Sequence, residues 1–192
     1  MGKHYEVRLA GLGGQGLILA GIIFAEAAGI HDGFYVTQTQ SYGAAARGGF
    51  SRSDVVMSDE EIHYPKASQL DLLLAMSQSA YEDNFKFLKP GGALVIDSTY
   101  VNVEGREDAI VIPFSKIARD KFGRENVANI IALGVITQVF PHVSAKSMEK
   151  AVLNRVPKAH IELNKNAFEE GVKAGKKALA DLKEGAKRVK ED

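Results

Sequence analysis

Short apolar or alternating runs along the chain predict strands, and longer apolar or amphipathic stretches predict helices. Strands are expected at residues 7–10, 35–40, 50–57, 71–76, 93–96 and 110–112. Helices are expected at residues 17–28, 79–88, 114–122, 127–140 and 144–156, with a glycine turn at 89–92. This order predicts an α/β fold with a doubly wound, mostly parallel sheet, helices on both faces, and residues 50–57 as the antiparallel exception.

Residues 164–192 form a charged segment without proline that predicts a C-terminal helix. Small or apolar residues recur at helical spacing on one side, at Phe168, Val172, Gly175, Leu179, Leu182, Ala186 and Val189. Gly171, Gly175 and Gly185 each weaken a helix by about 1 kcal/mol, so packing must support it. The support is either its own domain or a partner subunit. We expect a single domain, 1–192, with an α/β core over 1–160 and a C-terminal helix over 161–192.

A glycine-rich loop follows the first predicted strand and precedes a helix, in the pattern Gly-x-Gly-x-x-Gly. Its candidate site residues are Gly11, Gly13, Gly14, Gln15 and Gly16. Glycine lets the backbone approach a phosphate, and the N-terminus of the following helix attracts an anion. We expect a phosphate-bearing ligand here, contacted by free N–H groups of Gly13, Gly14 and Gln15. The alternative is that the glycines merely pack a tight turn.

Acidic residues are missing where two common nucleotide-binding classes need them. A dinucleotide site places an Asp or Glu at the end of the second strand, where this chain has Thr37 to Gln40, and Asp32 precedes that strand. The turn at residues 89–92 is like that of methyltransferases that use S-adenosylmethionine, yet residues 7–11 lack the expected acid. Both classes are therefore disfavoured.

A second loop of small residues follows the second predicted strand. Its candidate residues are Ser41, Tyr42, Gly43, Arg47, Gly48 and Gly49. In a parallel sheet it lies at the same edge as the first loop, and Ser77 and Gln78 after a later strand reach that edge too. The loop has no acid, base or thiol to move protons, but an aromatic ring and a bidentate cation suit recognition. Structural roles remain open: Arg47 as a solvated or paired cation, Ser77 as a helix N-cap.

Composition narrows the classes of function. With 24 Lys+Arg against 24 Asp+Glu, the chain lacks the basic surplus of a nucleic-acid or anionic-membrane binder. The absence of cysteine excludes thiolate metal sites, iron–sulfur ligation and a cysteine nucleophile. The five histidines are far apart, so no metal site is expected. No signal peptide or membrane span is recognisable, and we expect a cytoplasmic protein.

The two loops together resemble the gamma subunit of 2-oxoacid:ferredoxin oxidoreductases. The resemblance rests on GLGGQG at 11–16, SYGAAARGG at 41–49, Ser51, Ser53 and LDLLLAMSQ at 70–78, and it spans about residues 5–160. The family includes 2-oxoglutarate, ketoisovalerate and pyruvate branches. The sequence of the first loop is more similar to the 2-oxoglutarate branch than to the pyruvate branch.

The resemblance implies one subunit of an enzyme that decarboxylates a 2-oxoacid oxidatively to an acyl-CoA and passes electrons to ferredoxin. Thiamine diphosphate, Mg and iron–sulfur clusters are then expected in partner subunits of alpha, beta and delta type, and the isolated chain is expected to be inactive. No catalytic residue is expected in this chain; its two loops would face the interchain cleft and coenzyme A, the co-substrate. The alternatives are a stand-alone nucleotide-binding or regulatory domain, or a methyltransferase or dehydrogenase.

Overall fold

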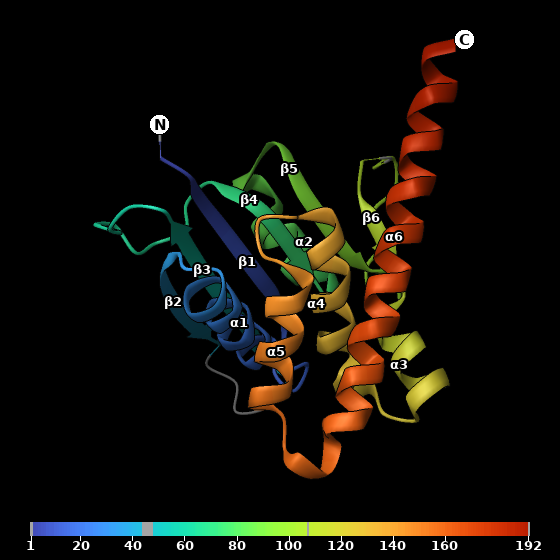
Figure 1. The fold of residues 1–192 in the computed structure, drawn as a ribbon. Helices are drawn as coiled ribbons and strands as arrows, with labels where there is room; N and C mark the ends of the chain where they lie inside the picture. The colour runs from blue at the N-terminus through green and yellow to red at the C-terminus, as the bar shows by residue number, and fades with distance from the viewer. Residues whose placement is uncertain (1, 44–47, 107, 192) are drawn as a thin grey trace.

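A computed structural model describes residues 2–43, 48–106 and 108–191, and side-chain surroundings as far as residue 184. Six strands form one sheet in the order β2-β3-β1-β4-β5-β6 (Figure 1). The strands are β1 (His4–Leu12), β2 (Tyr35–Tyr42), β3 (Phe50–Ser58), β4 (Leu70–Ala75), β5 (Leu88–Asp97) and β6 (Ile110–Ile112). Because β3 alone runs antiparallel to its neighbours, the predicted α/β fold with one antiparallel exception is confirmed.

Helices cover the two faces of the sheet unequally. They are α1 (Leu17–Glu26), α2 (Gln78–Asn84), α3 (Phe114–Phe122), α4 (Ala128–Val139), α5 (Ala145–Arg155) and α6 (Ile161–Glu191). The larger core lies between one face and α1, α3, α4, α5 and α6, with Leu9, Phe24 and Ile131 fully buried. On the other face a smaller core packs around α2 and the segment after β3.

Strand β1 extends beyond the predicted residues 7–10, because the charged residue before that run is buried and paired: Glu6 is 8% exposed, and its carboxylate accepts the Gln69 N–H at 2.7 Å. The charged residue inside the run is paired as well. Arg8 is 3% exposed, and its guanidinium donates to both carboxylate oxygens of Asp54 on β3, at 2.7 and 2.8 Å. It also donates to Asn84 Oδ1 and to the carbonyl of Ala67. A buried ion pair survives where its remaining hydrogen bonds are also satisfied, so a charge in the pattern does not end the strand.

The predicted helix 79–88 and the turn at 89–92 are wrong in their boundaries. Helix α2 ends at Asn84, a 3₁₀ turn covers Phe85–Phe87, and β5 starts at Leu88. The predicted turn lies inside β5 as an irregularity, because the register with β4 shifts between Leu70 and Leu72. Gly91, at φ 78°, makes this bulge possible.

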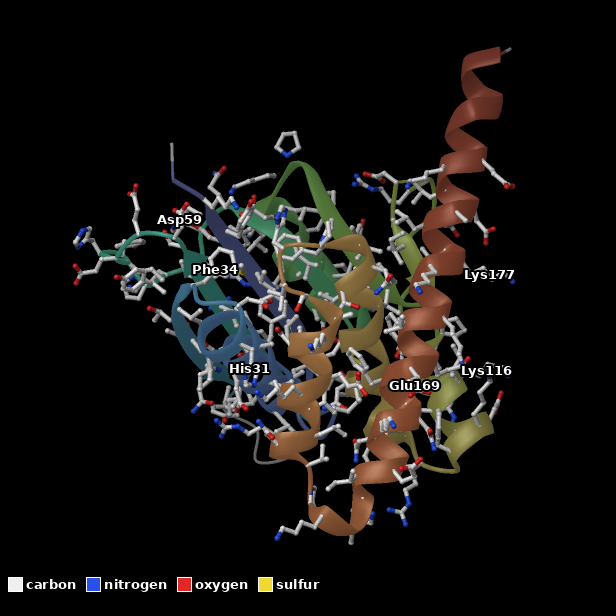
Figure 2. The ribbon with its side chains drawn as sticks, viewed as in Figure 1. His31, Phe34, Asp59, Lys116, Glu169 and Lys177 are labelled. Atoms are coloured by element: carbon white, nitrogen blue, oxygen red, sulfur yellow. The ribbon has the colours of Figure 1, made fainter. Side chains whose placement is uncertain are left out.

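Helix α6 crosses α4 at a point where the two backbones touch. A Cβ on Gly171 would lie 2.0 Å from the carbonyl oxygen of Ile131, and one on Gly134 would lie 2.3 Å from that of Phe168. Figure 2 shows Lys177 projecting from the opposite side of α6. The first half of α6 thus packs on its own domain, which is the first of the two supports expected from the sequence; the other was a partner subunit. Gly185, Ala186 and Val189 lie outside the described surroundings.

Candidate functional site

The first glycine loop lies between the carboxyl end of β1 and α1, and the side chain of Gln15 closes it. Gln15 Oε1 accepts the Leu12 N–H at 2.7 Å, and Gln15 Nε2 donates to the Met76 carbonyl at 2.8 Å. A Cβ on Gly11 would lie 2.3 Å from Gln15 Oε1, so glycine is required where this side chain folds back. Gln15 therefore ties the loop to the end of β4.

The backbone amides of this loop are not all free, which corrects the expectation for Gly13 and Gln15. Gly13 N–H donates to the Gly49 carbonyl at 2.7 Å and Gln15 N–H to the Leu12 carbonyl at 3.2 Å. Gly14 alone of the three has no intramolecular acceptor in the described part of the chain. Its φ is 99°, and a Cβ there would meet nothing within 4 Å. Gly14 is thus the position where the loop is open to a ligand.

The second loop lies directly beside the first, at the edge of the sheet where the sequence places it. The hydrogen bond from Gly13 to Gly49 joins the two loops, and Gly43 N–H donates to the Phe50 carbonyl at 2.7 Å, which closes the β2–β3 connection. Tyr42 is 63% exposed. Arg47, the candidate cation, lies outside the described residues.

An open cleft of about 610 Å³ follows this edge of the sheet. One wall consists of loop backbone at Gly13, Gln15 and Gly48, and its floor includes Ser77 and Gln78. Ser77 Oγ accepts the Ala80 N–H at 3.2 Å, so Ser77 is the N-cap of α2. Gln78 Oε1 accepts the Asn102 N–H at 2.9 Å.

The opposite wall carries two side chains that the sequence did not single out, and a third, Arg119, holds them. Tyr100 and Glu125 line the cleft. The Tyr100 hydroxyl donates to Glu125 Oε1 at 2.7 Å and accepts from Arg119 Nη1 at 2.9 Å. The hydrogen bond to Glu125 and partial burial raise the pKa of Tyr100, whereas that same bond and Arg119 lower the pKa of Glu125. The three residues form an ordered, charge-balanced wall, and their sequence positions share no motif.

A second hollow of about 300 Å³ adjoins the cleft, since both are lined by Gln15, Met76 and Glu125. Here Gly16 lies against the start of α4: Asn129 Nδ2 donates to its carbonyl at 3.0 Å. A Cβ on Gly16 would lie 2.5 Å from Asn129 Nδ2. Gly16 therefore serves close packing, while Gly14 faces open space.

Asp32, which the sequence places at the wrong end for a ribose contact, has a different role. Its carboxylate accepts the Ser144 N–H at 2.7 Å and the Ser147 hydroxyl at 2.5 Å, at the start of α5. It thereby fixes α5 at the edge of the sheet away from the loops. Across the described residues, no three His, Asp or Glu side chains gather as a metal site would require. Nor does any described helix have the length and apolar character to cross a membrane.

Known proteins resemble the chain over nearly its whole length. The family described as pyruvate ferredoxin/flavodoxin oxidoreductase matches residues 6–174. The 2-oxoglutarate synthase subunit KorC of Methanocaldococcus jannaschii is 44% identical, over 89% of this chain and 94% of that protein. KorC of Archaeoglobus fulgidus is 36% identical, over 92% and 91% of the two chains.

Two solved structures share the fold. The gamma subunit of a keto/oxoacid ferredoxin oxidoreductase from Geobacter sulfurreducens is 45% identical with a TM-score of 0.81, over 93% of this chain and 98% of that one. The 2-oxoglutarate:ferredoxin oxidoreductase from Magnetococcus marinus, with 2-oxoglutarate, coenzyme A and succinyl-CoA bound, is 28% identical with a TM-score of 0.78. It covers 91% of this chain but only 31% of that longer one.

The chain belongs to the pyruvate ferredoxin/flavodoxin oxidoreductase family. The resemblance to gamma subunits, drawn from the two glycine loops, is confirmed. The chain is a subunit of a 2-oxoacid:ferredoxin oxidoreductase, and neither a stand-alone nucleotide-binding domain nor a methyltransferase is favoured.

Proposed function

We propose that this chain supplies the coenzyme A-facing wall of an oxidoreductase that converts 2-oxoglutarate to succinyl-CoA, with electrons passing to ferredoxin. The observation that carries the proposal is the hydrogen bond from Gly13 N–H to the Gly49 carbonyl. It brings the two glycine loops into one wall of an open cleft. The choice of 2-oxoglutarate rests on the names of the KorC relatives and on the Magnetococcus complex.

The role of the wall is to bind, not to react. The Gly14 N–H, the start of α1 and the cation Arg47 suit a phosphate of coenzyme A. Tyr100, held by Arg119 and Glu125, gives the opposite wall an ordered aromatic surface. With the thioester-forming end of coenzyme A held between these walls, its thiol is presented to the reacting carbon in another subunit.

The redox chemistry is proposed to lie in partner subunits of alpha, beta and delta type. Thiamine diphosphate with Mg would supply the decarboxylation chemistry there, and iron–sulfur clusters would carry electrons to ferredoxin. This chain offers no cysteine as a cluster ligand. Its own contribution is thus confined to binding and orientation.

The experiment is reconstitution of the complex with and without this chain. We expect acyl-CoA formation to need the chain, and kcat/KM to be higher for 2-oxoglutarate than for pyruvate or 2-oxoisovalerate. The proposal would be contradicted if the complex without this chain still transferred electrons from 2-oxoglutarate at the full rate and still depended on coenzyme A. A preference for pyruvate would overturn the assignment of substrate alone.

A further inference from the structure

The two outer strands of the sheet differ in how they end it. Strand β6 has three residues and packs beside α6. Strand β2 has eight residues, and on its outer side no strand of the described chain pairs with it. In Figure 1, β2 forms the free margin of the sheet beside α1. The sheet therefore has one covered and one uncovered edge.

Strand β2 lacks the features with which proteins protect an exposed edge. Its sequence, YVTQTQSY, holds no charged residue and no proline, and its register with β3 continues without a bulge from Tyr35↔Ser58 to Tyr42↔Ser51. Natural edge strands are usually short, charged, bulged or covered. A regular, neutral edge of this length is what a strand from another chain can pair with.

Exposed large hydrophobic side chains stand at both ends of this edge. Tyr35 and Tyr42 at the two ends of β2 are 57% and 63% exposed, and Ile30, just before the strand, is 73% exposed. The two tyrosines lie at opposite ends of β2 and on opposite faces of the sheet. They therefore flank the open edge and do not form one apolar patch.

The direction of the backbone groups is fixed by the pairing with β3. Because Gly43 N–H donates to the Phe50 carbonyl, the alternation of an antiparallel ladder turns the odd-numbered amides of β2 toward β3. The amides and carbonyls of Gln38 and Gln40 then point outward. The side chain of Gln38 bonds Ser53 Oγ at 2.7 Å, on the face that α1 covers, so Thr37, Thr39 and Ser41 lie on the opposite face.

We propose that β2 pairs with β2 of a second copy of this chain, antiparallel about a two-fold axis at Thr39. This register sets Thr39 against Thr39, Thr37 against Ser41 and Val36 against Tyr42 of the other copy. Hydroxyl pairs and an aromatic–β-branched pair are favourable cross-strand neighbours. Because β2 is uncharged, self-pairing brings no like charges together. The pairing is isologous, as a closed dimer requires.

The absence of native cysteine permits a direct test. At the axis, Thr39 and its counterpart form a non-hydrogen-bonded pair with Cα atoms about 4.5 Å apart, which a disulfide can join. Thr37 is the matched control, because the two copies of residue 37 are four residues out of register, about 13 Å. We expect Thr39→Cys to form a disulfide-linked dimer under mild oxidation at least about tenfold faster than Thr37→Cys.

The test is run on the purified chain and on the reconstituted complex. Thr39→Lys, which sets two positive charges opposite each other, should shift the chain toward monomer in sedimentation, and Thr37→Lys, opposite Ser41, should do so less. Equal or no cross-linking of the two cysteine variants, with a monomeric wild-type chain, would overturn the proposal. Cross-linking of Thr39→Cys to a cysteine of another subunit would also overturn it and identify a hetero-subunit edge.

Discussion

The two walls of the cleft are built from different parts of the polypeptide. The first is backbone: glycine loops held by one main-chain hydrogen bond and by the side chain of Gln15. The second is side chain: Tyr100 between Arg119 and Glu125. Backbone groups are set by the fold before a ligand arrives, whereas side chains have to be held in place by partners. We therefore expect changes in the first wall to affect coenzyme A binding most.

The largest expected effect comes from Gly14, the open position of the first glycine loop, which lines the hollow adjoining the cleft. Gly14→Asp should raise the KM for coenzyme A at least about 100-fold, because two like charges 4 Å apart repel by about 4 kcal/mol at an effective dielectric of 20. Gly14→Ala is the control, since it shares the unfavourable positive φ but adds no charge. Steady-state kinetics of the reconstituted complex measures both. Equal effects of the two variants would show that backbone strain, not charge, is responsible.

Arg47 tests whether the backbone wall needs a cation. Arg47→Ala should leave the chain folded and weaken coenzyme A binding by about 1.5–3 kcal/mol, the cost of losing a charge-assisted hydrogen bond. Arg47→Lys, which keeps the charge but not the bidentate geometry, should recover part of the loss. Circular dichroism checks the fold and turnover of the complex checks the function. Wild-type assembly and wild-type kinetics for 2-oxoacid and coenzyme A would return this loop to the role of a structural turn.

Gln15 separates the support of the backbone wall from its contact with ligand. Gln15→Ala leaves the Leu12 N–H and the Met76 carbonyl without the partners they have now, at a cost of about 2 kcal/mol in unfolding free energy. Gln15→Glu keeps the acceptor for the Leu12 N–H but sets an ionised carboxylate oxygen against the Met76 carbonyl oxygen, so that two acceptors face each other. Its loss of unfolding free energy at neutral pH should therefore be at least as large as that of Gln15→Ala. Urea unfolding of the isolated chain measures this, and equal stability of wild type and Gln15→Ala would contradict the described role.

The smallest effect is expected for the side-chain wall. Tyr100→Phe removes the hydroxyl between two partly exposed charged groups, so the unfolding free energy should fall by less than about 1 kcal/mol. Tyr100 and Arg119 lower the pKa of Glu125 in the folded chain. The ionised Glu125 therefore stabilises the fold at pH values above 4.5, the ordinary pKa of this group. That stabilisation is lost as pH falls below 4.5 toward the folded pKa. The unfolding free energy, measured at pH 7 and at low pH, should fall less between the two in Tyr100→Phe than in the wild type. An equal fall in both would refute the coupling between Tyr100 and Glu125.

Much of the fold could be predicted because the strands are apolar and the loops are marked by glycine. Strand β6 falls on the predicted residues, and β3 has the predicted direction. The bulge in β5 could not be predicted, since a Pro-Gly-Gly sequence is typical of a turn and only pairing with β4 makes it part of a strand.

The backbone wall could be predicted for the same reason, and the side-chain wall could not. Glycines at fixed spacing after a strand carry their own signal, though not which of them packs and which is open. Gly11 and Gly16 are required by contacts with Gln15 and Asn129, which only the folded chain brings near. Tyr100, Arg119 and Glu125 come from separate segments that meet in space without any local pattern.

Hydrogen exchange of the assembled complex with and without coenzyme A is the most direct measurement of the proposed role. Backbone amides are the proposed contact, and exchange reports amides residue by residue. Coenzyme A should slow exchange in the segment containing Gly14, Gly16 and the start of α1, and leave β6 at the far edge of the sheet unchanged. The role proposed for this chain would be contradicted if saturating coenzyme A protected amides of another subunit and left the amides of this loop exchanging as before.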